Sequence, residues 1–159
     1  AQGNSPWKFV GKPEPVFSGA KASVREAKGL SQHFFTDANP KLAIGPDFCQ
    51  LSGEDATIVP FLAGGGVGCI SVTANVAPKE MAEFHDAWND GDIGRAQAIN
   101  DRLMPLHEAL FCETSPGPVK YAAHLLGKCG PELRLPLCEI SPASKTCVEG
   151  AMRSAGILN

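Results

Sequence analysis

The sequence contains no long apolar run and has no excess of positive charge. No uninterrupted apolar stretch approaches the roughly 18 residues that a membrane-spanning helix needs, and the N-terminus lacks the charged-then-apolar pattern of a signal peptide. A net charge of -3 over 159 residues provides no general attraction for nucleic acid. These absences predict a cytoplasmic protein with neither membrane nor nucleic-acid partners.

Metal-binding and redox motifs are also missing. No cysteine pair has the CxxC spacing, and most cysteines lie among apolar neighbours, which favours small buried thiols in a reducing compartment over the disulfides of a secreted protein. No histidine has a second histidine or a cysteine three or four residues away, so we predict no metal site. The cysteines are Cys49, Cys69, Cys112, Cys129, Cys138 and Cys147, and the histidines are His33, His85, His107 and His124.

A glycine run at residues 64–68 is the one candidate for a phosphate-binding loop. It lacks the Gly-Lys-Ser/Thr ending of a P-loop, and it precedes an expected strand instead of opening a helix. We therefore interpret it as a tight turn between a helix and a strand, and we predict no cofactor.

The chain divides by pattern into three parts. Residues 1–47 scatter proline and glycine and sustain neither helical nor strand periodicity, so their fold is left uncertain. Residues 48–77 show a short strand at 48–52, a helix at 55–63 and a second strand at 69–73. This order predicts an α/β unit with two parallel strands.

Residues 78–159 have helical periodicity throughout. Pro78 is expected to open one helix and Gly91 to end it, and the next helix carries a continuous apolar stripe from Ala96 to Leu110. A third helix is expected from Pro118 to Gly127. The fourth takes Ser141 as its N-cap and is expected to bury four residues, Cys147, Val148, Ala151 and Met152.

The carboxyl end of the first strand is the place to look for chemistry, because α/β folds keep their sites there. Gly53 presents no side chain, so the backbone of Ser52 and Gly53 can approach a ligand closely. Alternatively, Glu54 and Asp55 are simply first-turn residues that the helix dipole favours. The residues alone do not decide between these two readings.

From residue 45 to residue 158 the chain resembles the C-terminal part of the dihydrodipicolinate synthase (4-hydroxy-tetrahydrodipicolinate synthase) family, within the class I aldolase group that includes N-acetylneuraminate lyase. Four motifs, in order along the chain, carry the resemblance: LSGEDA at 51–56, GCISVTANVA at 68–77, NDRLMPLH at 100–107 and PGPVK at 116–120.

The resemblance implies a partial TIM (β/α)8 barrel that contains the last two strands, followed by a C-terminal helical bundle. Family members are usually homotetramers that condense pyruvate with aspartate semialdehyde through a lysine Schiff base, in lysine biosynthesis. Gly53 and Ile70 match positions that line the pyruvate site in the family.

The reactive groups of the family are harder to find in this sequence. The family's lysine lies in a Gly-Ile-Lys context, where the nearest passage here has Arg25, whereas Lys28 falls at about the family's distance from Gly53. Lys28 is thus the candidate Schiff-base residue, with a solvated surface lysine as the alternative. The family's proton relay uses two tyrosines and a threonine from the first half of the barrel, and the sole tyrosine here is Tyr121.

These features lead to two expectations for function. The first is a synthase-like lyase whose chain is incomplete and has little activity alone. The second is a non-catalytic half-barrel that acts through self-association or a partner chain, because unpaired strand edges and an open apolar face favour pairing.

Overall fold

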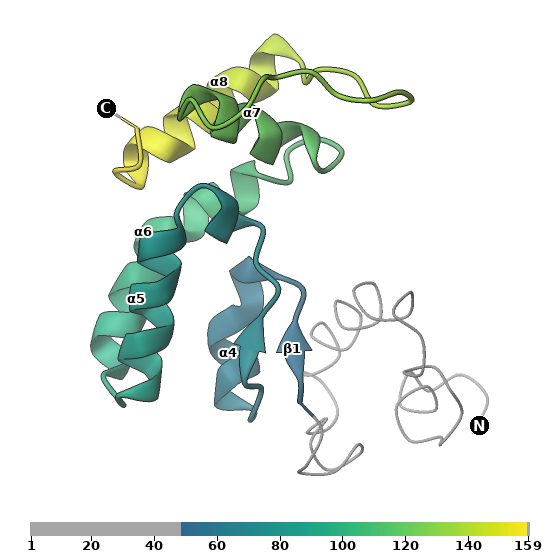
Figure 1. Cartoon of the computed structure of the whole chain (residues 1–159). Helices are drawn as coiled ribbons and strands as arrows, with labels where there is room; N and C mark the ends of the chain where they lie inside the picture. The colour runs from purple at the N-terminus through teal and green to yellow at the C-terminus, as the bar shows by residue number, and fades with distance from the viewer. Residues whose placement is uncertain (1–48, 159) are drawn as a thin grey trace, which may run out of the picture. The chain divides into compact units, whose positions relative to one another are not determined.

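The computed structural model describes residues 49–158, whose elements are drawn in colour in Figure 1. The chain divides into two compact units after Ser71. The expectations for residues 1–47 and for Lys28 lie outside the described residues and stay predictions.

The first unit is built on a parallel pair of short strands, β1 (Leu51–Ser52) and β2 (Gly68–Cys69). Between them lie a 3-10 turn, η2 (Asp55–Thr57), and the helix α4 (Ile58–Ala63). The predicted order of strand, helix and strand is therefore confirmed, with the helix beginning as a 3-10 turn. Both strands are shorter than predicted, and the chain beyond β2 tightens into a second 3-10 turn, η3 (Thr73–Asn75).

The glycine run makes the turn that returns the chain from α4 to β2. The Gly64 amide donates to the Pro60 carbonyl at 3.1 Å, and Gly65 has a φ of 98°, a conformation that favours glycine. The Gly66 amide donates to the Phe61 carbonyl at 3.0 Å. The interpretation of this run as a helix-to-strand turn is thus confirmed.

We expect Gly66→Ala to destabilise the first unit by about 1–3 kcal/mol, because overpacking forces neighbouring groups to move. A Cβ at Gly66 would overlap the buried ring of Phe61 and lie 2.9 Å from its carbonyl oxygen, which α4 holds in place. Thermal unfolding followed by circular dichroism would measure the change. Gly150→Ala is the matched control: nothing lies within 4 Å of a Cβ there, and alanine in a helix interior should stabilise slightly. An unchanged midpoint for Gly66→Ala would contradict the packing of Phe61.

The second unit is helical. Helix α5 packs against α6, α6 against α8, and α7 against α8 (Figure 1). The helices are α5 (Pro78–Asn89), α6 (Ile93–Ala109), α7 (Gly117–Leu125) and α8 (Pro142–Ser154).

The predicted ends and faces of these helices are largely confirmed. Gly91, with a φ of 78°, follows the end of α5, and Gly127, with a φ of 68°, follows α7. Ser141 caps α8 by accepting a hydrogen bond from the Ser144 amide at 3.2 Å. The stripe on α6 is buried throughout: Ala96, Ile99, Leu103, Leu106 and the C-cap residue Leu110.

The expected burial of the cysteines is wrong. Cys69 is half-buried and the other five are exposed, although all six are free thiols. Cys147 shows the reason: the buried stripe of α8 is centred on Val148 and Met152, and Cys147 lies about 100° around the helix from Val148. An apolar neighbour in the sequence is therefore not a neighbour on the buried face.

No helix within the described part of the chain has the length and apolar character needed to cross a membrane. In the same residues, no group of three or more histidine, cysteine, aspartate or glutamate side chains could hold a metal ion.

Candidate functional site

The carboxyl ends of β1 and β2 lie side by side and form the candidate site. Ser52 is paired with Cys69, and the Ile70 amide donates to the Ser52 carbonyl at 2.8 Å. Gly53 and Ile70 directly follow the paired residues, so the register brings them to the same edge. Gly53 is half-buried, and Ile70 is 55% exposed. The edge thus presents an open backbone position beside an exposed apolar side chain.

A local hydrogen-bond pattern fixes the loop after β1. The buried Ser52 hydroxyl donates to the Glu54 carbonyl at 3.0 Å and accepts from the Glu54 amide at 3.1 Å. A serine side chain bonded to the backbone two residues on is a common way to shape a turn. This pattern orients the backbone of Gly53 at the strand end.

Asp55 and Cys69 meet behind this edge. The Cys69 thiol donates to the Asp55 Oδ1 at 3.7 Å, and Asp55 is only 2% exposed. The reading of Asp55 as a simple first-turn residue is therefore incomplete, because its carboxylate also accepts from β2. Only the strand register could have predicted this contact. It pairs Cys69 with Ser52, which directly precedes the loop that carries Asp55.

Burial, and then the nearby Asp55 carboxylate, raise the pKa of the Cys69 thiol well above its ordinary range. Since the thiolate is the nucleophile, we expect iodoacetamide at pH 8 to alkylate Cys69 at least about tenfold more slowly than the exposed Cys138. Peptide mass mapping over time would measure both rates in one sample.

Asp55→Asn should lower the pKa of Cys69 and move its alkylation to lower pH. Glu54→Gln is the control and should have a smaller effect, because the charge of Glu54 contributes less than that of Asp55. Equal alkylation rates for Cys69 and Cys138 in the unaltered chain would contradict the inference that the Cys69 thiol is partly buried and protonated.

In the helical unit, a buried hydrogen bond joins two of the sequence motifs. Thr73 Oγ1 and His107 Nδ1 lie 2.7 Å apart, with both residues at most 2% exposed. Thr73 belongs to the 68–77 motif and His107 to the 100–107 motif. Sequence reasoning missed the pair, because 34 positions separate the two residues and no periodicity connects them.

We expect Thr73→Val to lower the free energy of unfolding by about 1–3 kcal/mol, because it keeps the side-chain shape and removes a buried hydrogen-bond partner. Urea unfolding would measure the loss. Thr146→Val is the matched control: its exposed hydroxyl donates only to the Pro142 carbonyl at 3.1 Å, so the change should stay within about 0.5 kcal/mol. Equal effects of the two changes would argue against a stabilising role for the Thr73–His107 bond.

Comparison with known proteins covers most of this chain. Residues 22–155 match the dihydrodipicolinate synthetase family. This match begins before the four motifs and includes Lys28.

Relatives of known function share high identity with the chain over part of their length. The 4-hydroxy-tetrahydrodipicolinate synthase of Rhodospirillum centenum is 59% identical over 118 residues, which are 74% of this chain and 40% of the relative. The synthase of Parvibaculum lavamentivorans is 63% identical over 116 residues, which are 73% of this chain and 40% of the relative. The chain thus spans about two fifths of the length of these relatives.

Solved structures give the same assignment for the fold. Dihydrodipicolinate synthase from Aquifex aeolicus superposes with a TM-score of 0.72 at 36% identity, covering 85% of this chain and 44% of that protein. The chloride-inhibited enzyme from Acinetobacter baumannii, complexed with pyruvate, gives 0.71 at 32% identity, covering 85% and 43%. The two strands and the helices are part of the TIM-barrel fold of these proteins, and the chain belongs to the dihydrodipicolinate synthetase family.

Proposed function

We infer that this chain contributes one wall of a pyruvate site to synthase chemistry of the lyase type, in the cytoplasm and within a homo-oligomer. The position of Gly53 and Ile70 at adjacent strand ends is the observation that carries this proposal. The backbone at Gly53 allows close approach of a small ligand, and Ile70 offers an apolar contact for the methyl group of pyruvate.

Lys28 is the candidate nucleophile. An unprotonated lysine amine attacks the keto carbon of pyruvate and expels water to form an imine. Loss of a methyl proton gives an enamine that adds to the aldehyde of aspartate semialdehyde, and water then releases the product from the lysine. The reaction needs an amine with a lowered pKa and a proton relay. These reaction steps use no metal ion or cofactor.

Borohydride trapping with pyruvate tests the proposal. Borohydride reduces an imine to a stable amine, so the chain should gain one pyruvate-derived adduct, and peptide mapping should place it on Lys28. Lys28→Arg should abolish the adduct, because the guanidinium stays protonated. The matched control Lys79→Arg should retain it, since Lys79 lies exposed on α5.

Substitution at the strand ends tests the wall of the site. Ile70→Asp should reduce the adduct yield at Lys28, because it places a hydrated carboxylate where the methyl group of pyruvate is expected to pack. Val67→Asp, at an exposed position before β2, should not reduce the yield. Absence of any adduct in the unaltered chain would contradict the Schiff-base assignment.

A non-catalytic, self-associating half-barrel is the second candidate, and exposed apolar side chains around the strand pair favour it. Leu51 is 38% exposed, Val67 60% and Ile70 55%. Clustered apolar residues beside strand edges favour pairing with another chain. Light scattering would test this candidate, and a monomer at micromolar concentration would count against it.

A further inference from the structure

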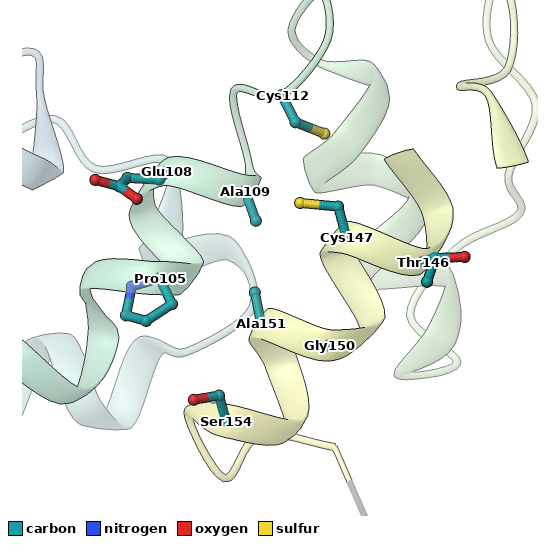
Figure 2. Close-up of a pocket in the computed structure, with 9 residues that line it drawn as sticks. All are labelled: Pro105, Glu108, Ala109, Cys112, Thr146, Cys147, Gly150, Ala151 and Ser154. Atoms are coloured by element: carbon teal, nitrogen blue, oxygen red, sulfur yellow. The ribbon is translucent and has the colours of Figure 1, made fainter. Parts of the chain in front are cut away.

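Two cysteines line a groove in the helical unit. The groove has a volume of about 460 Å³ and lies between the end of α6 and α8. Cys112 follows α6 and Cys147 lies on α8, and Figure 2 shows both side chains at the same end of the groove, near Ala109. Both thiols are free and exposed.

Hydrogen bonds hold the segment around Cys112 against the first turn of α8. The Glu113 carboxylate accepts from the Ser144 hydroxyl at 2.8 Å and from the Ser141 amide at 3.1 Å. Hydrogen bonding from the Ser141 side chain, then from the Ser144 side chain and the Ser141 amide, lowers the pKa of the Glu113 carboxyl, so it stays ionised at neutral pH. Because Glu113 adjoins Cys112 and Ser144 lies about one helical turn before Cys147, the bonds hold the segment that carries Cys112 against the N-terminal part of α8.

The two thiols also interact with each other. Partial burial, followed by the neighbouring Cys112 thiol, raises the pKa of the Cys147 thiol. This effect agrees with Figure 2, in which both side chains lie at the same end of the groove.

We propose that Cys112 and Cys147 are a redox-modification site that a low-molecular-weight disulfide converts into an intramolecular disulfide. One protein thiolate attacks the reagent disulfide and displaces a first thiolate, which takes up a proton. The second protein thiolate attacks the protein sulfur of this mixed disulfide and releases a second thiol. The two protein sulfurs are oxidised, and the reagent is reduced to two thiols. The link joins the end of α6 to α8.

Oxidised glutathione added to the full chain tests this site. After an acid quench and alkylation, peptide mapping should show a Cys112–Cys147 link as the main product. Its yield should exceed that of the same reaction in urea by roughly tenfold or more, because folding raises the effective concentration of the two thiols. In Cys112→Ser, Cys147 should remain a mixed disulfide with glutathione, and no link to Cys147 should form.

Cys138→Ser is the matched control, since Cys138 is exposed but does not line the groove. This variant should retain the full yield of the Cys112–Cys147 link. Links distributed equally among Cys112, Cys129, Cys138 and Cys147 would overturn the proposal. Disulfide links between two chains, seen on a non-reducing gel, would also overturn it. The same holds if Cys112 and Cys147 stay as mixed disulfides with glutathione and do not form the intramolecular link.

Discussion

The purified 159-residue chain is expected to form the synthase product at least about 100-fold more slowly than the Rhodospirillum centenum relative under the same conditions. General acid–base groups contribute typically 10²–10⁴-fold to an enzymatic rate. By family resemblance, the relay that supplies this contribution needs two tyrosines, and the sequence has one. The difference should appear in the rate even where the Schiff base forms.

Tyr121 is poorly suited to replace the missing relay. It lies on α7, and its hydroxyl donates to the Glu149 carboxylate of α8 at 2.7 Å. That bond raises the pKa of Tyr121 and so holds its proton. Tyr121→Phe should therefore leave the residual rate unchanged. The measurement requires a sample whose mass has been verified, and turnover comparable to that of the full-length relative would refute the expectation.

The local rules of the sequence predicted the helical unit well. Gly91 and Ser141 mark helix boundaries through a positive φ and an N-cap bond, both of which depend on residues close in sequence. The apolar stripe on α6 was visible because its period matches the helix. Burial on α8 was harder to predict from the sequence. A residue beside a buried apolar residue in the sequence lies about 100° around the helix from it and can therefore be exposed. Cys147 was misplaced for this reason.

For the candidate site, the sequence predicted the order of strand, helix and strand, but not the side-chain contacts between them. The rule that sites lie at the carboxyl ends of strands pointed to Gly53, whereas Ile70 was expected from the family resemblance alone. The observed register places both residues directly after paired strand residues. The contact of Cys69 with Asp55 depends on that register, and the bond between Thr73 and His107 depends on how η3 meets α6. Contacts between segments far apart in the sequence leave no periodic pattern. For this reason the sequence did not predict either of these two contacts.

Leu103→Ala is expected to remove about 2–5 kcal/mol from the free energy of unfolding of the helical unit. Leu103 is 0% exposed near the middle of α6, the helix that packs against both α5 and α8. Truncation deletes buried methyl groups and leaves a cavity that the surrounding helices fill only partly. Because folded domains are stable by only about 5–15 kcal/mol, this loss should lower the unfolding midpoint in urea substantially.

Leu135→Ala is the matched control, because the same atoms are removed from a side chain that is 91% exposed. A change at such a position should stay within about 0.5 kcal/mol. The difference between the two leucine variants therefore measures burial in the helical unit, independently of any catalytic role. Equal midpoints would mean that α6 does not form the centre of this core. A large difference together with an unchanged pyruvate adduct would show that the strand-end site and the helical core can be perturbed separately.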